Sequence, residues 1–122
     1  MKRVLVAEDN KLILDTIVYC LKREGYEILE ANNGKECLKI LEDCEVDLII
    51  TDLYMPYVNG HEIISILREE RQNNTPILVL SSAGMEDNVL KAFELGADDF
   101  MVKPFSLVEL NIRVRKILAM RR

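Results

Sequence analysis

The chain has 122 residues, of which 49% are hydrophobic and 30% are charged, and its formal net charge is -5. This length fits a single domain with its own core, and this composition is ordinary for a globular protein and argues against disorder. The acidic balance argues against nucleic acid or anionic membrane as a partner. No apolar run is long enough to span a bilayer, and acids follow the amino terminus too soon for a signal peptide, so we expect a cytoplasmic protein.

Five short apolar runs predict β-strands. In chain order they lie at Val4–Ala7, Glu27–Ala31, Leu48–Ile50, Ile77–Leu80 and Phe100–Val102, and the second is the weakest. Continuous apolar runs are typical of strands that are buried on both faces. We therefore expect a parallel sheet with helices on each side.

Segments with helical spacing follow these strands. Their apolar stripes consist of Leu14, Ile17, Val18 and Leu21; Cys37, Leu38 and Leu41; Ile63, Ile64 and Leu67; Val89, Ala92, Phe93 and Leu95; and Leu107, Leu110, Val114, Ile117 and Leu118. Gly25 and Gly96 follow helical segments, where a left-handed cap residue is needed, and Asn32–Gly34 provides turn and cap chemistry before the second helix. Five strands that alternate with five helices predict an α/β fold with no internal domain boundary.

Polar residues stand where the predicted strands end. Glu8 and Asp9 follow the first strand, Asp52 follows the third, Ser81 the fourth and Lys103 the fifth. Because the carboxyl ends of parallel strands emerge at one edge of a sheet, we expect these side chains to meet. Three carboxylates need more positive charge than one lysine supplies, and oxygen ligands without His or Cys suit Mg²⁺. An aspartate beside Mg²⁺ and a lysine can attack phosphorus, so the residues predict a Mg²⁺-dependent phosphoryl site.

Each of these residues also has a simpler explanation when it is taken alone. Asp9 or Asn10 would cap the following helix, Asp52 would be a turn residue, and Lys103 would be solvated. The agreement of four strand ends favours the common site over these separate explanations.

The cysteines and the only histidine carry no comparable signal. Cys20, Cys37 and Cys44 are odd in number and form no C-x-x-C pair, so we expect free thiols and no zinc site. His61 follows Gly60 near a predicted helix start, where we expect a surface or capping role rather than a phosphoacceptor.

The whole chain resembles the receiver domain of two-component response regulators. The resemblance is carried by the acidic pair, by "DLYMPYVNG" after it, by "ELGADDF", and by "KPF" with Lys103 placed 22 residues after Ser81. It implies a flavodoxin-like fold, with five parallel strands in the order 2-1-3-4-5 and five helices on both faces. This strand order comes from the family and not from the residue pattern.

The resemblance also implies roles for the acidic residues. Asp52 would accept a phosphoryl group from a phosphohistidine of a sensor histidine kinase or a phosphotransfer protein. Asp9, Asp52 and the backbone carbonyl of Tyr54 would bind Mg²⁺, with Glu8 acting through water or as a second acid. The chain would catalyse only its own phosphorylation and dephosphorylation, and so it would not be an enzyme for other substrates.

The remaining implied roles concern the switch itself. Lys103 would pair with the acids and then with the phosphoryl oxygens, aided by a cis peptide bond to Pro104. Ser81 would turn toward the phosphate, and Phe100 would follow it inward. A downstream target protein would then bind the face formed by Glu86–Leu95 and Asp98–Arg122, and the chain would be a monomer or a phosphorylation-driven dimer.

The carboxyl-terminal segment carries five cations, which are Arg113, Arg115, Lys116, Arg121 and Arg122. They suggest a nucleic-acid patch, but complementing the helix end and solubilising its outer face explains them more simply. We therefore expect no nucleic acid partner for this chain, which has no residues after position 122 for a helix-turn-helix module and is expected to act as a stand-alone receiver over residues 1–122.

Two positions depart from the commonest family pattern. Tyr54 is bulky and Ala83 cannot orient a water molecule, so we expect a long-lived phosphorylated state. Tyr54 also occupies the place where a Mg²⁺-dependent phosphohydrolase of the haloacid-dehalogenase type needs a second aspartate. That enzyme class, a scaffold that works without phosphorylation and an intermediate carrier in a phosphorelay are the alternatives.

Overall fold

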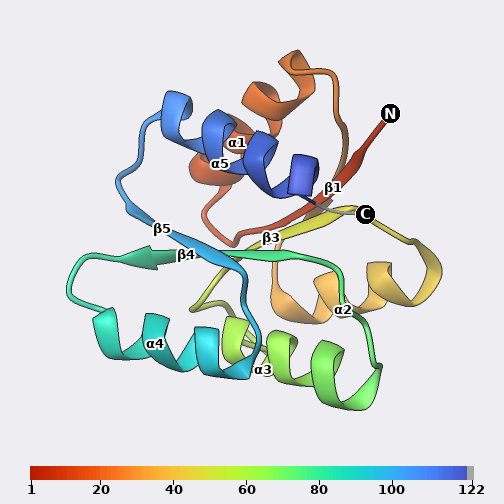
Figure 1. Cartoon of the computed structure of the whole chain (residues 1–122), viewed down its shortest axis with the longest axis vertical. Coiled ribbons are helices and arrows are strands. Elements are labelled where there is room, and N and C mark those ends of the chain that lie inside the picture. The colour runs from red at the N-terminus through yellow and green to blue at the C-terminus, as the bar shows by residue number, and fades with distance from the viewer. Residues whose placement is uncertain (121–122) are drawn as a thin grey trace.

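A computed structural model describes residues 1–120 of the chain, and Figure 1 shows its arrangement. The five strands are β1 (Arg3–Ala7), β2 (Glu27–Ala31), β3 (Leu48–Asp52), β4 (Ile77–Ser82) and β5 (Asp99–Lys103). The α-helices are α1 (Lys11–Arg23), α2 (Gly34–Asp43), α3 (Gly60–Ser65), α4 (Glu86–Leu95) and α5 (Leu107–Met120), and a π-helical turn, η1 (Ile66–Glu70), continues α3. No helix among the described residues has the length and apolar character to cross a membrane.

The strands form one parallel sheet in the order β2-β1-β3-β4-β5, which confirms the expected topology. Its register places Ala7 beside Thr51, Asp52 beside Leu80, and Ser82 beside Lys103. The carboxyl ends of β1, β3, β4 and β5 therefore lie at one edge of the sheet.

Helices cover both faces of this sheet, with α1 and α5 on one face and α2, α3 and α4 on the other (Figure 1). Successive strand residues point to opposite faces. Accordingly Val4 and Val6 pack with α1 and α5, whereas Leu5 and Ala7 pack with α2 and α3. The central strands are buried on both faces, and this two-sided burial is why they read as continuous apolar runs.

The helices begin in two different ways. Helices α1, α2 and α3 each begin with an asparagine cap, whose side chain accepts a hydrogen bond from a backbone amide of the first turn; the caps are Asn10, Asn33 and Asn59. In α5 the hydroxyl of Ser106 accepts a hydrogen bond from the backbone amide of Glu109. Helix α4 begins after Met85, whose side chain makes no capping hydrogen bond. Among the five α-helices in the described part of the chain, α4 alone therefore lacks a side-chain cap at its amino end.

Two residues of the predicted apolar stripes lie in the expected helices but are exposed. Phe93 is 39% exposed and Leu107 is 41% exposed. Phe93 instead meets Phe100 edge to face, with ring centroids 5.8 Å apart, at the rim of a surface hollow. Leu107 is the first residue of α5 and precedes the part of that helix that packs on the sheet, where Leu110 and Val114 are buried.

The cysteines are free thiols, as expected. Cys20 and Cys37 are buried and Cys44 is partly buried. Burial raises the pKa of the Cys37 thiol to about 12, so this group remains protonated and packs as a small apolar side chain.

Candidate metal and phosphoryl site

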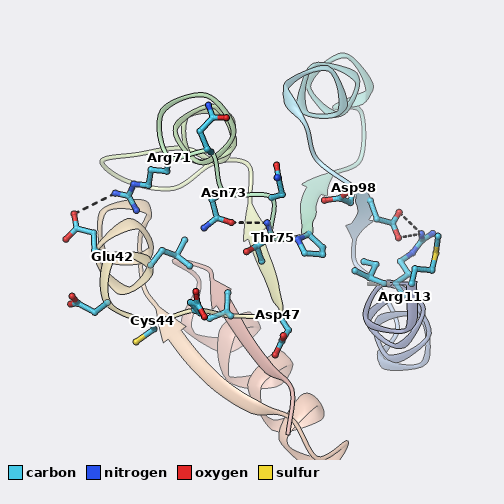
Figure 2. A pocket seen from close by; sticks show the side chains of 18 of the residues that line it. Glu42, Cys44, Asp47, Arg71, Asn73, Thr75, Asp98 and Arg113 are labelled. Carbon is cyan, nitrogen blue, oxygen red and sulfur yellow. Dashed lines mark hydrogen bonds and ion pairs between the residues drawn. The ribbon is translucent and has the colours of Figure 1, made fainter. Parts of the chain in front are cut away.

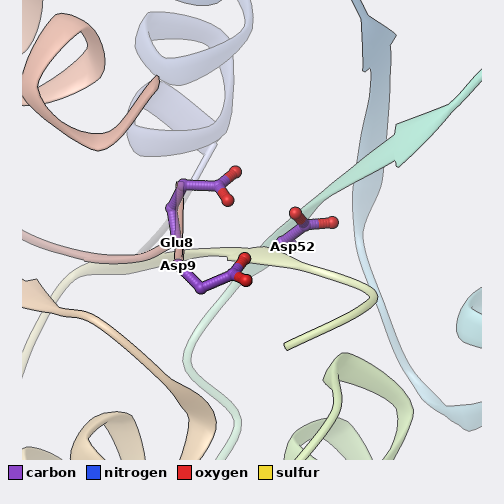
Figure 3. Close-up of side chains that lie close together, drawn as sticks. All are labelled: Glu8, Asp9 and Asp52. Atoms are coloured by element: carbon purple, nitrogen blue, oxygen red, sulfur yellow. The ribbon is translucent and has the colours of Figure 1, made fainter. Parts of the chain in front are cut away.

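Three carboxylates meet at the carboxyl edge of the sheet. Glu8 and Asp9 follow β1, Asp52 ends the neighbouring strand β3, and each offers an oxygen within 4.8 Å of the others (Figure 3). Glu8 is completely buried and Asp52 is 8% exposed, whereas Asp9 is open to solvent. The cluster is thus closed on the inside and accessible from one side.

Lys103 completes this group from the edge strand β5. Its Nζ lies 2.6 Å from Oδ2 of Asp52 and 2.8 Å from Oε1 of Glu8, and its side chain is 19% exposed. The peptide bond from Lys103 to Pro104 is cis, as the family resemblance implied. The lysine reaches across the end of β4, so that side chains from three strands form one ionic cluster.

Burial and charge oppose each other in this cluster. Desolvation raises the pKa of Glu8 to about 7, and nearby Asp52 adds to the shift, although Lys103 and the Asn10 amide counteract it. Burial alone would lower the pKa of Lys103, but its hydrogen bonds to Asp52 and Glu8 outweigh this and raise it. Lys103 is therefore charged, and one cation faces three carboxyl groups.

Sequence reasoning did not anticipate how deeply Glu8 is buried. Its backbone amide donates to the carbonyl oxygen of Ala31 at 3.0 Å, which extends the β1–β2 pairing by one residue beyond the strand and draws Glu8 into the core. Only the neighbouring strand provides this contact, and no local signal in "VLVAEDN" reveals it.

The capping explanation for Asp9 is wrong. Oδ1 of Asn10 accepts the amide of Ile13 at 3.1 Å, and the Asn10 amide donates to Oε2 of Glu8 at 3.0 Å. The backbone amides of Asn10 and Ile13 at the start of α1 therefore find acceptors without Asp9. The Asp9 carboxylate lies beside that of Asp52. Solvation does not explain Lys103 either, because it makes two short ionic contacts.

The donor set fits Mg²⁺. All three candidate ligands are carboxylate oxygens, with neither nitrogen nor sulfur among them, and the exposed position of Asp9 leaves room for the water that Mg²⁺ retains. Asp9 and Asp52 are the residues that would hold the ion, with Glu8 behind them. When bound, the ion would neutralise charge on the carboxylates and on a phosphoryl group.

The other predicted residues lie around this cluster. Ser81 follows Leu80, the register partner of Asp52, and its hydroxyl is buried without a hydrogen-bond partner in the part of the chain described. A buried hydroxyl without a partner is costly, and a ligand that accepts a hydrogen bond from it would relieve that cost. The Tyr54 side chain is 51% exposed, and the metal-binding role of its carbonyl stays a prediction.

The described residues line at least two surface hollows, and the larger of these two lies away from this chemistry. It has a volume of about 1190 Å³ and is lined by the segments that precede β3, β4 and β5, at the opposite edge of the sheet (Figure 2). Ion pairs such as Arg71–Glu42 and Arg113–Asp99 border it. The smaller hollow, of about 370 Å³, is apolar and runs from Ser81 along α4 and β5.

Comparison with known proteins identifies the class to which this fold and site belong. A family model described as the response regulator receiver domain matches residues 4–115. A probable transcriptional regulatory protein of Picosynechococcus is 43% identical over 123 residues, covering 95% of this chain and 49% of the relative. The alkaline phosphatase synthesis transcriptional regulatory protein PhoP of Bacillus subtilis is 40% identical, covering 96% and 48%. The chain spans about half the length of the curated relatives it matches.

Solved structures give the same assignment. The Francisella response regulator 1452 receiver domain has a TM-score of 0.91 and 35% identity, with 98% of each chain covered. The chemotaxis response regulator CheY4 of Vibrio cholerae has a TM-score of 0.89 and 30% identity, covering 96% of this chain and 98% of its own. The chain belongs to the receiver domain family of response regulators, whose members signal through phosphorylation and use Mg²⁺.

Proposed function

We propose that this chain is a Mg²⁺-dependent phosphoryl switch and that Asp52 is the phosphoacceptor. The observation that carries the proposal is the position of the Asp52 carboxylate, which lies beside two further acids and the ammonium group of Lys103. Its oxygen attacks the phosphorus of a phosphohistidine on a sensor kinase or phosphotransfer protein. A P–O bond forms, the P–N bond breaks, and the imidazole leaves with the electron pair and takes up a proton.

The switch follows from a change in charge. Phosphorylation adds nearly two negative charges and three strong acceptors beside Lys103 and Ser81. In this proposal Lys103 transfers its contact from Asp52 to a phosphoryl oxygen, and the Ser81 hydroxyl gains the acceptor that it lacks. Full conversion of an almost entirely inactive protein takes about 5.5 kcal/mol, which a few charge-assisted hydrogen bonds can supply. Phe100, half-buried beside Phe93, would follow Ser81 inward.

The output face in this proposal consists of Glu86–Leu95 and Asp98–Arg122, of which the last two residues lie outside the described part of the chain. Large apolar side chains are exposed on α4, β5 and α5, and they include Leu90, Phe93, Val102, Val108 and Ile112. A partner protein or a second copy would cover them. The named relatives are transcriptional regulatory proteins, so we propose that the signal is passed to a regulatory partner or module.

The described part of α5 does not favour nucleic acid as that partner. Arg113 pairs with Asp99 and Glu109, and Arg115 lies 3.4 Å from Glu24. No basic residue stands in the last described turn of α5, so the expected complement to the helix end would fall to Arg121 and Arg122, which are not described. We propose that this chain signals through protein contacts alone.

One reaction separates the proposed switch from its alternatives. The chain is incubated with Mg²⁺ and acetyl phosphate, and phosphoryl incorporation and inorganic phosphate are followed by intact mass and by phosphate assay. We expect one phosphoryl group per chain, with Asp52→Asn lowering its rate of formation by roughly a thousandfold or more because the nucleophile is gone. Asp43→Asn, at the exposed end of α2, is the matched control and should react like the wild type.

The alternative functions predict different results in the same acetyl phosphate experiment. A phosphohydrolase would release many phosphates per chain, and a scaffold would neither gain mass nor release phosphate. We further propose that the phosphorylated state is long-lived, because Tyr54 is bulky and Ala83 cannot orient an attacking water. Prompt phosphate release without a partner would contradict that part alone. A relay carrier differs by passing its phosphoryl group on to an added histidine phosphotransfer protein.

A further inference from the structure

Helix α4 is fixed firmly at its carboxyl end. The carbonyl oxygen of Gly96 accepts hydrogen bonds from Nε and Nη2 of Arg68 at 3.1 and 2.9 Å. The same guanidinium donates to the carbonyl oxygens of Asn73 and Thr75 and to the carboxylate of Asp98. Because the Arg68 side chain is only 15% exposed and joins α4 to η1 and to the segment before β4, this end of α4 cannot shift without breaking several bonds.

The amino end of α4 is held much less firmly. Met85 supplies no side-chain cap to its first turn. The apolar hollow of about 370 Å³ lies beside this end and is lined by Leu90 and Phe100, among others. Leu90 is 61% exposed, and the buried residues of α4 are Val89 and Ala92. The first turns of this helix therefore have space to move and few buried contacts to resist the movement.

A single side chain reaches this end from the neighbouring helix. Nε2 of His61, in the first turn of α3, lies 2.8 Å from the carbonyl oxygen of Asn88 in the first turn of α4. A carbonyl oxygen only accepts, so the imidazole carries a proton on Nε2 and donates it. Within residues 1–120, no other side chain from outside α4 and its cap residue hydrogen-bonds to that turn.

We propose that His61 is a releasable latch that holds the amino end of α4 in its unphosphorylated position. The helix pivots about the Arg68–Gly96 contact, and the short segment 83–85 connects its amino end to the end of β4, where Ser81 lies. The consequence for signalling rests on the proposed function, in which Ser81 moves toward the phosphoryl group. A bond made only in the unphosphorylated position lowers the population of the competent form, so its removal raises that population.

The test uses the complete chain and a pair of substitutions at His61. His61→Leu keeps an apolar side chain and removes the donor, whereas His61→Gln keeps an N–H group that can reach the same carbonyl. Lys91→Gln, on the exposed side of α4, is the control. Amide hydrogen exchange is measured for α4 and for α1 without a phosphodonor, and the rate of phosphorylation by acetyl phosphate with Mg²⁺ is then measured for each variant.

We expect His61→Leu to raise exchange in α4 relative to α1 by roughly two- to tenfold, as the loss of one hydrogen bond predicts. Its phosphorylation rate should rise by a similar or smaller factor. His61→Gln should recover most of the protection, and Lys91→Gln should match the wild type.

Two results would overturn the latch. One is α4 exchange that does not change, and the other is an equal rise in α1 and α4, which would indicate a general loss of stability. Selective loosening of α4 with no change in phosphorylation rate would overturn its regulatory role. If no variant, including the wild type, takes up a phosphoryl group, the proposed function fails, and the exchange ratio still decides whether the latch exists.

Discussion

Helices α3 and α4 lie side by side on the same face of the sheet, yet their amino ends are anchored in opposite ways (Figure 1). In α3 a capping box joins Asn59 and Glu62, with hydrogen bonds of 2.9 and 3.0 Å. In α4 the corresponding end has no cap and borders an apolar hollow. The amino end of α3, which follows Asp52 in the chain, is therefore held in place by its cap. The amino end of α4, which follows Ser81, has no such cap and can move when the site changes.

The same contrast extends to the loops. At Gly34 an added Cβ would overlap the carbonyl oxygen of Val58, so α2 packs directly against the loop between β3 and α3. At Gly84, in the turn before α4, an added Cβ would meet nothing within 4 Å. The proposed switch needs both properties, because the acids must keep their geometry while the proposed output face changes.

Substitution of the two glycines should give the largest difference. Gly34→Ala forces the start of α2 away from the backbone of Val58 and should lower the free energy of unfolding by about 3 kcal/mol. Gly84→Ala meets no atoms but places Ala at a φ of +86°, so it should cost about 1–2 kcal/mol. Urea unfolding of both variants measures this. Equal losses would show that the two loops are equally constrained and would break the contrast.

The pH dependence of stability tests how rigidly Glu8 is enclosed. Folded Glu8 keeps its proton up to about pH 7, whereas its ordinary pKa is 4.5, so the folded state binds more protons between these values. The free energy of unfolding should therefore fall as pH rises through that window in the absence of Mg²⁺. Glu8→Gln should remove about 2–3 kcal/mol of this fall.

The control for this measurement is Glu30→Gln, on the exposed side of edge strand β2. Its stability should follow the wild-type profile from pH 4.5 to 8. If the free energy of unfolding had the same pH dependence in the wild type and in Glu8→Gln, the acidic cluster would have relaxed enough to solvate Glu8. The acids would then not be held rigidly.

A pair of cap substitutions should have the smallest effects. Asn59→Ala removes the α3 cap and should cost about 1 kcal/mol, whereas Met85→Asn offers α4 the cap that it lacks and should add about 0.5 kcal/mol. Thermal unfolding of each variant measures the change. A stabilised α4 should also take up phosphoryl groups more slowly from acetyl phosphate, and an unchanged rate would show that this helix end does not limit the reaction.

Much of this protein could be predicted from its sequence because the relevant physics is local or periodic. Continuous apolar runs and helical stripes predicted five strands and five helices, and the weak run at Glu27–Ala31 proved to be edge strand β2 with the same bounds. Parallel strands all end at one edge, so Asp9, Asp52 and Lys103 were expected to converge from distant positions, and the structure brings them into one cluster.

The tertiary structure alone decided what depends on neighbouring elements. The burial of Glu8 follows from its bond to Ala31, and the exposure of Phe93 follows from the hollow between α4 and β5. His61 gave no signal beyond its place at a helix start, because its acceptor is a backbone carbonyl 27 residues away. Apolar periodicity records which face of an element is covered, but it does not record which polar atom of another element a side chain will meet.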